Sequence, residues 1–120
     1  RYFEQPIFHA YLARVDGRVG GFALVSSRVN HRPGPGMYID EFFVLRTYRR
    51  QGVGRALAHQ LFDRYPGYWE VCQIAPNTSA TAFWRQVIHE YTGGRYDEIT
   101  TDEGGMRHIW QLFNQADSIS

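Results

Sequence analysis

The amino-acid sequence predicts an α/β domain, built on a mixed, mostly antiparallel sheet of about six strands with two main helices. Three observations support this prediction: short runs of apolar and β-branched residues, two longer segments with apolar residues at helical spacing, and the order in which the two kinds follow each other. With 120 residues the chain is long enough for one core and too short for two. We therefore expect a single domain over residues 1–120.

The first part of the chain predicts three consecutive strands. Residues 8–15 alternate apolar and polar side chains, and an Asp-Gly pair, typical of a tight hairpin turn, separates them from a second strand over residues 19–26. A polar loop rich in Pro and Gly follows over residues 28–36. The run 37–45 then predicts a third strand.

The second part of the chain predicts helices and strands in alternation. Apolar residues recur every four positions over residues 53–65, which predicts a helix that a Pro-Gly pair ends. Residues 68–74 read as a strand, and Asn77 or a neighbouring hydroxyl residue caps a second helix. Two more short runs predict closing strands, over residues 95–100 and 107–113.

Composition narrows the function. All 13 basic residues are arginine, yet the formal net charge is only +1, which argues against nucleic acid and membrane surfaces as partners. The single cysteine, Cys72, cannot form an internal disulfide and reads as a small buried hydrophobe. The five histidines show no ligand spacing, so we expect no metal site. No apolar run is long enough to span a bilayer, and we expect a cytoplasmic protein.

An anion-binding loop is predicted between the third strand and the first helix. It reads Arg49-x-x-Gly52-x-Gly54, so two glycines stand where the first-turn N–H groups lack partners within the helix. Backbone donors, the helix dipole and arginine forks together suit a diphosphate. Two other phosphate loops do not match, because no Lys-Ser/Thr pair follows Gly54 and Leu57 stands where a dinucleotide motif needs glycine. The alternative is a Gly-rich turn with solvated arginines.

This loop resembles the Q/R-x-x-G-x-G/A signature of the GCN5-related N-acetyltransferases, the GNAT family, whose members hold the pyrophosphate of acetyl-coenzyme A on it. The predicted element order is similar to the family fold from its second strand to its end, and lacks the family's first strand and first two helices. The segment from Asn77 resembles a second signature, N-x-x-A-x-x-F/L-Y-x-x-x-G-F. It departs from that signature in two places, with Trp84 for the tyrosine and residues 88–90 without the Gly-Phe pair.

The resemblance implies acetyl-coenzyme A as cofactor, entering between the strands 39–45 and 68–74. It also implies that the backbone of Phe43 and Val44 pairs with the pantetheine amides. Trp84 is either a wall for the cofactor or an ordinary core residue. The implied cofactor-binding residues are Phe43, Val44, Arg49, Arg50, Gln51, Gly52, Val53, Gly54, Arg55, Asn77 and Trp84.

The resemblance implies an N-acetyltransferase that moves acetyl from acetyl-coenzyme A to a primary amine of a small molecule or protein by direct attack. The amine must lose a proton, and Glu41 and Glu70 are the candidate general bases, with Asp40 as a weaker third. Each carboxylate has the alternative of being solvated or paired with arginine. A second hypothesis is a coenzyme A-binding module with weak or no transferase activity, because Trp84 cannot act as the acid that the tyrosine provides. Exposed apolar residues also suggest a homodimer, namely Tyr2, Phe3, Ile7 and Phe8.

Overall fold

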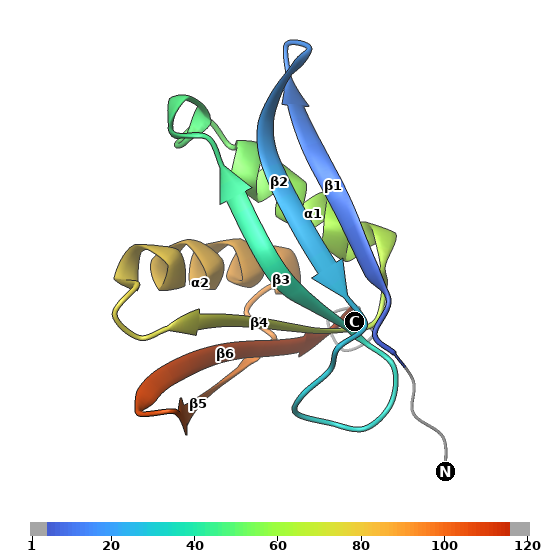
Figure 1. The fold of residues 1–120 in the computed structure, drawn as a ribbon, viewed down its shortest axis with the longest axis vertical. Coiled ribbons are helices and arrows are strands. Elements are labelled where there is room, and N and C mark those ends of the chain that lie inside the picture. The colour runs from blue at the N-terminus through green and yellow to red at the C-terminus, as the bar shows by residue number, and fades with distance from the viewer. Residues whose placement is uncertain (1–4, 116–120) are drawn as a thin grey trace.

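The computed structural model describes residues 5–115, which form one six-stranded sheet with two α-helices on one of its faces (Figure 1). The predicted fold class and element order are confirmed; the short η1 was not predicted. The elements are β1 (Phe8–Val15), β2 (Arg18–Ser26), β3 (Met37–Val44), η1 (Arg46–Tyr48), α1 (Val53–Arg64), β4 (Tyr68–Ile74), α2 (Thr78–Thr92), β5 (Asp97–Glu103) and β6 (Met106–Asn114).

The strands lie in the order β1-β2-β3-β4-β6-β5, and each neighbouring pair is antiparallel except β3 and β4. The first hairpin turns through Asp16 and Gly17, both with positive φ, as the Asp-Gly pair predicts. The parallel β3–β4 pair needs a long crossover, and α1 provides it. The sheet is therefore mixed at one seam only.

At that seam the two strands separate soon after they meet. They are paired only at Met37 with Trp69 and at Tyr38 with Glu70, and beyond these pairs β3 runs away from β4 (Figure 1). The register between β2 and β3 shifts at the same place, which leaves Asp40 as an extra residue in β3. Such a β-bulge bends the strand that carries it. The bulge at Asp40 thus marks the point where the sheet opens.

The bulge also decides which β3 side chains face the helices. Ile39 belongs to the buried core, and Phe42, three residues later, packs against it too. Asp40 and Glu41 between them occupy the bulge, so Glu41 and Phe43 lie on the other face. The core lies between the two helices and the face of the sheet that they cover. It includes Leu61, Phe62, Trp69, Trp84, Ile88 and Phe113.

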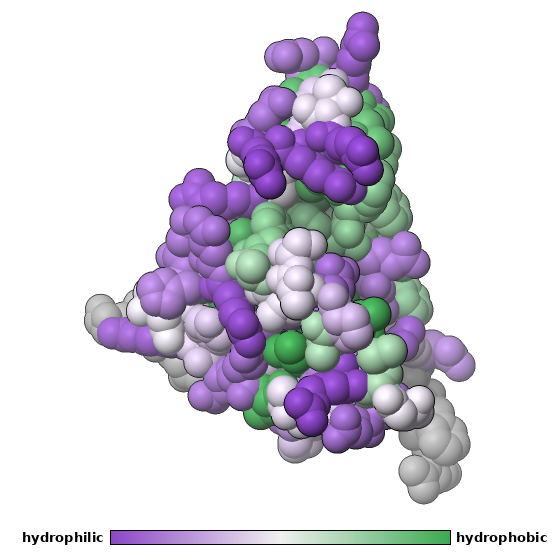
Figure 2. Space-filling view, turned by 90° about the vertical axis from the view of Figure 1, so that its left-hand side faces the viewer, coloured by the Kyte–Doolittle hydropathy of each residue, from purple (hydrophilic) through white to green (hydrophobic). Residues whose placement is uncertain are grey.

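The other face of the sheet carries no helix within residues 5–115. Several apolar side chains stand on it, with Phe8, Leu12 and Phe43 exposed by 46%, 56% and 47%. Figure 2 looks at the side of the molecule where β3 and β4 diverge. Hydrophobic side chains gather in the middle of this view and along its right-hand border. Neither helix of the described chain is long and apolar enough to cross a membrane.

Candidate active site

The turn from η1 into α1 is shaped by two residues with left-handed backbone. Gly52 stands at the N-cap of α1 with φ +78°, and Arg50 has φ +66°. No acidic residue lies in the first turn of α1, and its N–H groups have no intrahelical acceptors. The end of α1 therefore offers backbone donors and the positive end of the helix dipole to an anion.

Gly54 fixes this turn against the rest of the site. A Cβ atom there would lie 3.1 Å from Cζ of Phe83 and 3.3 Å from Cγ2 of Val44. These distances are short enough that any side chain would displace its neighbours. The first turn of α1 is consequently packed between the end of β3 and the start of α2, where the sheet opens.

The side chains of the predicted loop do not all point to one place. Arg49 donates from Nε to the carbonyl oxygen of Val44 at 3.0 Å, and Gln51 donates from Nε2 to that of Thr47 at 2.8 Å. Arg55, predicted in the diphosphate cradle, instead donates from Nε to Oε1 of Glu90 on α2 at 2.7 Å.

The pair between Arg55 and Glu90 lowers the pKa of Glu90. A surface ion pair of this kind is screened by solvent and contributes little net stability, so a phosphate can compete for the arginine.

The hydrogen bonds of β3 show which of its backbone groups face the opening. The N–H of Leu45 donates to the carbonyl of Gly20 at 2.8 Å, and backbone direction alternates along an antiparallel strand. Phe43 therefore directs its N–H and C=O toward β2, while Phe42 and Val44 direct theirs toward the opening. The backbone of Val44 faces the opening, as the predicted pairing with pantetheine requires. The backbone of Phe43 faces β2 instead, so Phe42 takes its place, because the backbone groups of consecutive strand residues point in opposite directions.

Trp84 and Asn77 have structural roles. Trp84 is 6% exposed and packs edge-on against Phe42, with ring centroids 4.7 Å apart, so its core-packing alternative is the one observed. The side-chain Oδ1 of Asn77 accepts from the N–H of Ala80 at 3.3 Å, which caps α2 as predicted. Both residues sit where α2 meets the opening, so they shape it through the fold.

The three candidate bases lie in three different environments. Glu41 is exposed on the helix-free face. Asp40, at the bulge, has a side chain only 10% exposed; Oδ1 lies 3.6 Å from Nη2 of Arg28, while Oδ2 is buried without a hydrogen-bond partner. Glu70 is fully buried and accepts four hydrogen bonds, from Asn30, His31 and Tyr68.

A carboxylate has about four lone-pair sites, so the bonding of Glu70 argues against the base role predicted for it.

Tyr38 and Cys72 are both held in their protonated forms. Burial raises the pKa of the Tyr38 hydroxyl to about 12, with further contributions from Cys72 and Asp40. Burial, Glu103 and Glu70 raise the pKa of the Cys72 thiol to about 12. Cys72 is therefore a thiol at neutral pH and a poor nucleophile. Tyr38 drew no prediction from sequence, because only the bulge brings its ring, Asp40 and Arg28 together.

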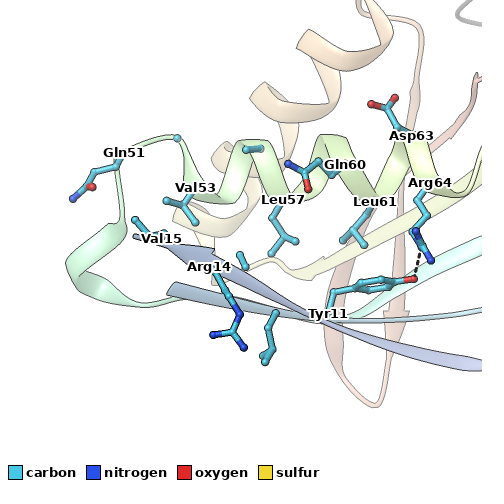
Figure 3. A pocket seen from close by; sticks show the side chains of 14 residues that line it. Tyr11, Arg14, Val15, Gln51, Val53, Leu57, Gln60, Leu61, Asp63 and Arg64 are labelled. Atoms are coloured by element: carbon cyan, nitrogen blue, oxygen red, sulfur yellow. Dashed lines mark hydrogen bonds between the residues drawn. The ribbon is translucent and has the colours of Figure 1, made fainter. Parts of the chain in front are cut away.

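A groove lies between β1 and α1, with a volume of about 720 Å³. Figure 3 shows Leu57 and Leu61 of α1 pointing into it, and Arg64 donating to the hydroxyl of Tyr11. Gln51 and Gly52 also line this groove, so it extends to the predicted anion-binding loop. It contains none of the three candidate bases. Within the part of the chain that the structure describes, no three or more His, Cys, Asp or Glu side chains are grouped to hold a metal ion.

Comparison with solved structures returns many proteins of the same fold. A protein of Bacillus anthracis, assigned as a streptothricin acetyltransferase and solved with acetyl coenzyme A, has a TM-score of 0.66 and 19% identity. The match covers 94% of this chain and 65% of the Bacillus protein. The ribosomal-protein-S18-alanine N-acetyltransferase of Escherichia coli has a TM-score of 0.63 and 19% identity, over 88% of this chain and 68% of that one. This chain thus spans about two thirds of the length of these structures.

NAA60 of Arabidopsis thaliana, solved with a bisubstrate analogue, matches with a TM-score of 0.59 and 15% identity over 88% of this chain and 74% of its own. Comparison with curated protein sequences gives no significant match. A family model described as the acetyltransferase (GNAT) family matches residues 1–88. The resemblance carried by the loop signature is confirmed: this chain belongs to the GNAT family of acetyltransferases.

Proposed function

We propose that this chain binds acetyl-coenzyme A in the opening between β3 and β4 and transfers its acetyl group to a primary amine. One observation carries the proposal: the sheet opens at the bulge of β3, and the N-terminus of α1 is packed against the same strand end through Gly54. The diphosphate lies on the first-turn amides of α1, from Gly52 to Arg55. The pantetheine arm runs along β3 and pairs with the free backbone groups of Phe42 and the N–H of Val44.

The acceptor amine approaches from the helix-free face, where Asp40 and Glu41 lie. Its nitrogen attacks the thioester carbon, the carbon–sulfur bond breaks, and coenzyme A leaves as a thiolate that solvent protonates. The proton lost by the amine passes to a carboxylate, directly or through water. Asp40 is the strongest of the three candidates, because its buried Oδ2 has no partner in the described structure and an unpaired buried acceptor favours a donor such as an ammonium.

Most of the rate in this scheme comes from positioning of the two reactants rather than from the base. The scheme needs no covalent acyl-enzyme, and the raised pKa of Cys72, about 12, keeps its side chain a poor nucleophile at neutral pH. The second hypothesis, a coenzyme A-binding module with weak or no transferase activity, is favoured by the core position of Trp84, which leaves no tyrosine acid at that place. Incubation with acetyl-coenzyme A and a panel of small-molecule and peptide amines separates the two. Thiol release that depends on the amine supports transfer, and tight cofactor binding without release supports the module.

We also propose that the free edge of β1 pairs with a second copy of the chain. The N–H of Ser27 donates to the carbonyl of Ile7, so the outward backbone groups of β1 are those of Phe8, Ala10 and Leu12. A two-fold axis at Ala10 would join these groups and place Phe8 beside Leu12 of the partner subunit, which covers the two exposed side chains. Tyr2 and Phe3, also expected at this interface, lie outside the described residues.

Light scattering tests this pairing. The unmodified chain should be a dimer, and Ala10→Lys should be a monomer because two like charges would meet at the axis. A monomeric unmodified chain at high concentration would remove the proposal.

A further inference from the structure

Glu70 lies at the centre of a small hydrogen-bond network that ties a loop to the sheet. Its Oε1 accepts from the backbone N–H and the side-chain Nδ2 of Asn30, at 2.8 and 3.1 Å. Its Oε2 accepts from the N–H of His31 and the hydroxyl of Tyr68, both at 2.8 Å. The carboxylate itself has no exposed surface. A buried charge is costly unless it is fully hydrogen-bonded, and here each bond fixes the loop or its neighbour.

The loop that Glu70 holds has no regular structure of its own. It follows β2 and runs over residues 28–36, with two prolines and two glycines at its end. Arg32 adds one more contact, with its guanidinium 3.9 Å from the centre of the Tyr68 ring. Residues 28–32, called the anchored segment below, are therefore fixed to β4 by side-chain contacts rather than by strand pairing.

The anchored segment reaches the place where the sheet opens. At one end Arg28 lies against Asp40, and next to Asn30 the ring of His31 packs edge-on against Trp110, with centroids 4.2 Å apart. Only two side-chain atoms in residues 5–115 are buried without a hydrogen-bond partner, and these are Nε2 of His31 and Oδ2 of Asp40.

One of these two atoms belongs to the anchored segment, and the other to the residue that this segment contacts. Buried polar groups are almost always paired in folded proteins, so these two exceptions, one on the segment and one on the residue that Arg28 contacts, suggest a polar ligand.

We propose that Glu70 is a positioning residue, which holds the anchored segment as the wall of the acceptor site, and that His31 contacts the acceptor there. Glu70 itself stays away from the reacting atoms, because its four bonds leave no lone pair for a proton. The acceptor this site fits is a primary amine with a second polar group, since Asp40 receives the amine and His31 Nε2 pairs with the other group. This inference rests on the proposed acetyl transfer.

The test compares Glu70→Gln with the unmodified chain in three measurements: amide hydrogen exchange at residues 30 and 31, the KM for the best amine of the panel, and cofactor affinity. In the Gln variant a donating NH₂ group replaces one of the two acceptor oxygens. It faces the donors that this oxygen served, so two of the four hydrogen bonds are lost. We expect exchange at both amides to be at least tenfold faster, the amine KM to rise at least tenfold, and cofactor affinity to change less than twofold. Asp102→Asn, the same chemical change on the exposed end of β5, should leave all three values unchanged.

Three results would overturn the inference. If kcat falls with an unchanged amine KM and recovers at high pH, Glu70 is the base. If exchange accelerates and the amine KM does not change, the segment is structural only. If the unmodified chain acetylates no amine of the panel, the proposed function fails and this inference fails with it. This outcome is distinct from the first two, because it appears in the unmodified chain rather than in the Glu70→Gln variant.

Should Glu70→Gln not fold, Tyr68→Phe removes one donor and keeps the charge. It should raise the amine KM by a smaller factor in the same direction, and an unchanged KM in this variant would also count against the role of Glu70.

Discussion

Replacing Gly54 by aspartate tests the diphosphate cradle most sharply, because the new side chain has only one direction in which to go. Its Cβ would already lie 3.1 Å from the Phe83 ring and 3.3 Å from Val44, so the carboxylate must point outward over the first turn of α1. That is the proposed position of the diphosphate. The variant would put a negative charge on the anion's own binding site.

The expected loss can be worked from the bonds involved. Each charge-assisted bond to a phosphate oxygen contributes roughly 1.5–3 kcal/mol, so losing two costs about 3–6 kcal/mol, or roughly a hundredfold to ten-thousandfold in affinity. The fold itself should survive. A carboxylate at a helix N-terminus stabilises by about 0.3–1 kcal/mol, and a residue other than glycine within a helix adds up to about 1 kcal/mol, which offsets the crowding against Phe83.

Thermal unfolding with and without acetyl-coenzyme A measures this directly. At 100 times its Kd a cofactor adds about 2.7 kcal/mol, which for a domain of this size raises the melting temperature by roughly 10 °C. Gly54→Ala is the matched control, since it brings the same Cβ contacts without the charge and should keep most of the shift. If Gly54→Asp melts like the unmodified chain alone and still shows the full shift with cofactor, the diphosphate does not lie on this turn.

Three further predictions concern the chemistry. Asp40→Asn should lower kcat at neutral pH by about 10²–10⁴-fold, with partial recovery at high pH, where the amine loses its proton unaided. Glu41→Gln should lower kcat less. If Glu41→Gln has the larger effect, Glu41 is the base. Trp84→Tyr should keep cofactor affinity in a titration, and raise or maintain turnover, because tyrosine can donate a proton where indole cannot; a large loss of affinity would show that the indole lines the cofactor. Since the pKa of Cys72 is raised to about 12, the thiolate fraction is small from pH 7 to 9 and grows only above that. Alkylation of Cys72 should therefore be slow in this range, and Cys72→Ala should keep full turnover. Fast labelling at pH 8 would contradict this.

Sequence patterns were most informative where a local signal decides the structure. The Asp-Gly hairpin, the helix predicted over residues 53–65 and the Asn77 cap depend on neighbouring residues, and the structure contains all three. The bulge at Asp40 could not be read in the same way. Apolar Ile39 and Phe42 enclose two acidic residues, and this pattern is compatible with either a regular or a bulged strand. The pairing with β2 decides between the two.

The parts of the site that sequence reasoning missed depend on long-range contacts. Glu70 looked like a free carboxylate, but its partners Asn30 and His31 lie 40 and 39 positions earlier in the chain. The ion pair between Arg55, a predicted cradle residue, and Glu90 could not be read from the sequence either, because the two residues are 35 positions apart. A signal for Glu70 did exist, since a lone acidic residue in the middle of an apolar strand must find several donors if it is buried.

A crystal structure of this chain with acetyl-coenzyme A would show whether the cofactor lies in the opening between β3 and β4. We expect the diphosphate on the backbone amides of residues 52–55, the pantetheine arm beside Phe42 and Val44, and the thioester near the bulge at Asp40. A cofactor found in the groove between β1 and α1, or one whose diphosphate lies away from the first turn of α1, would contradict it.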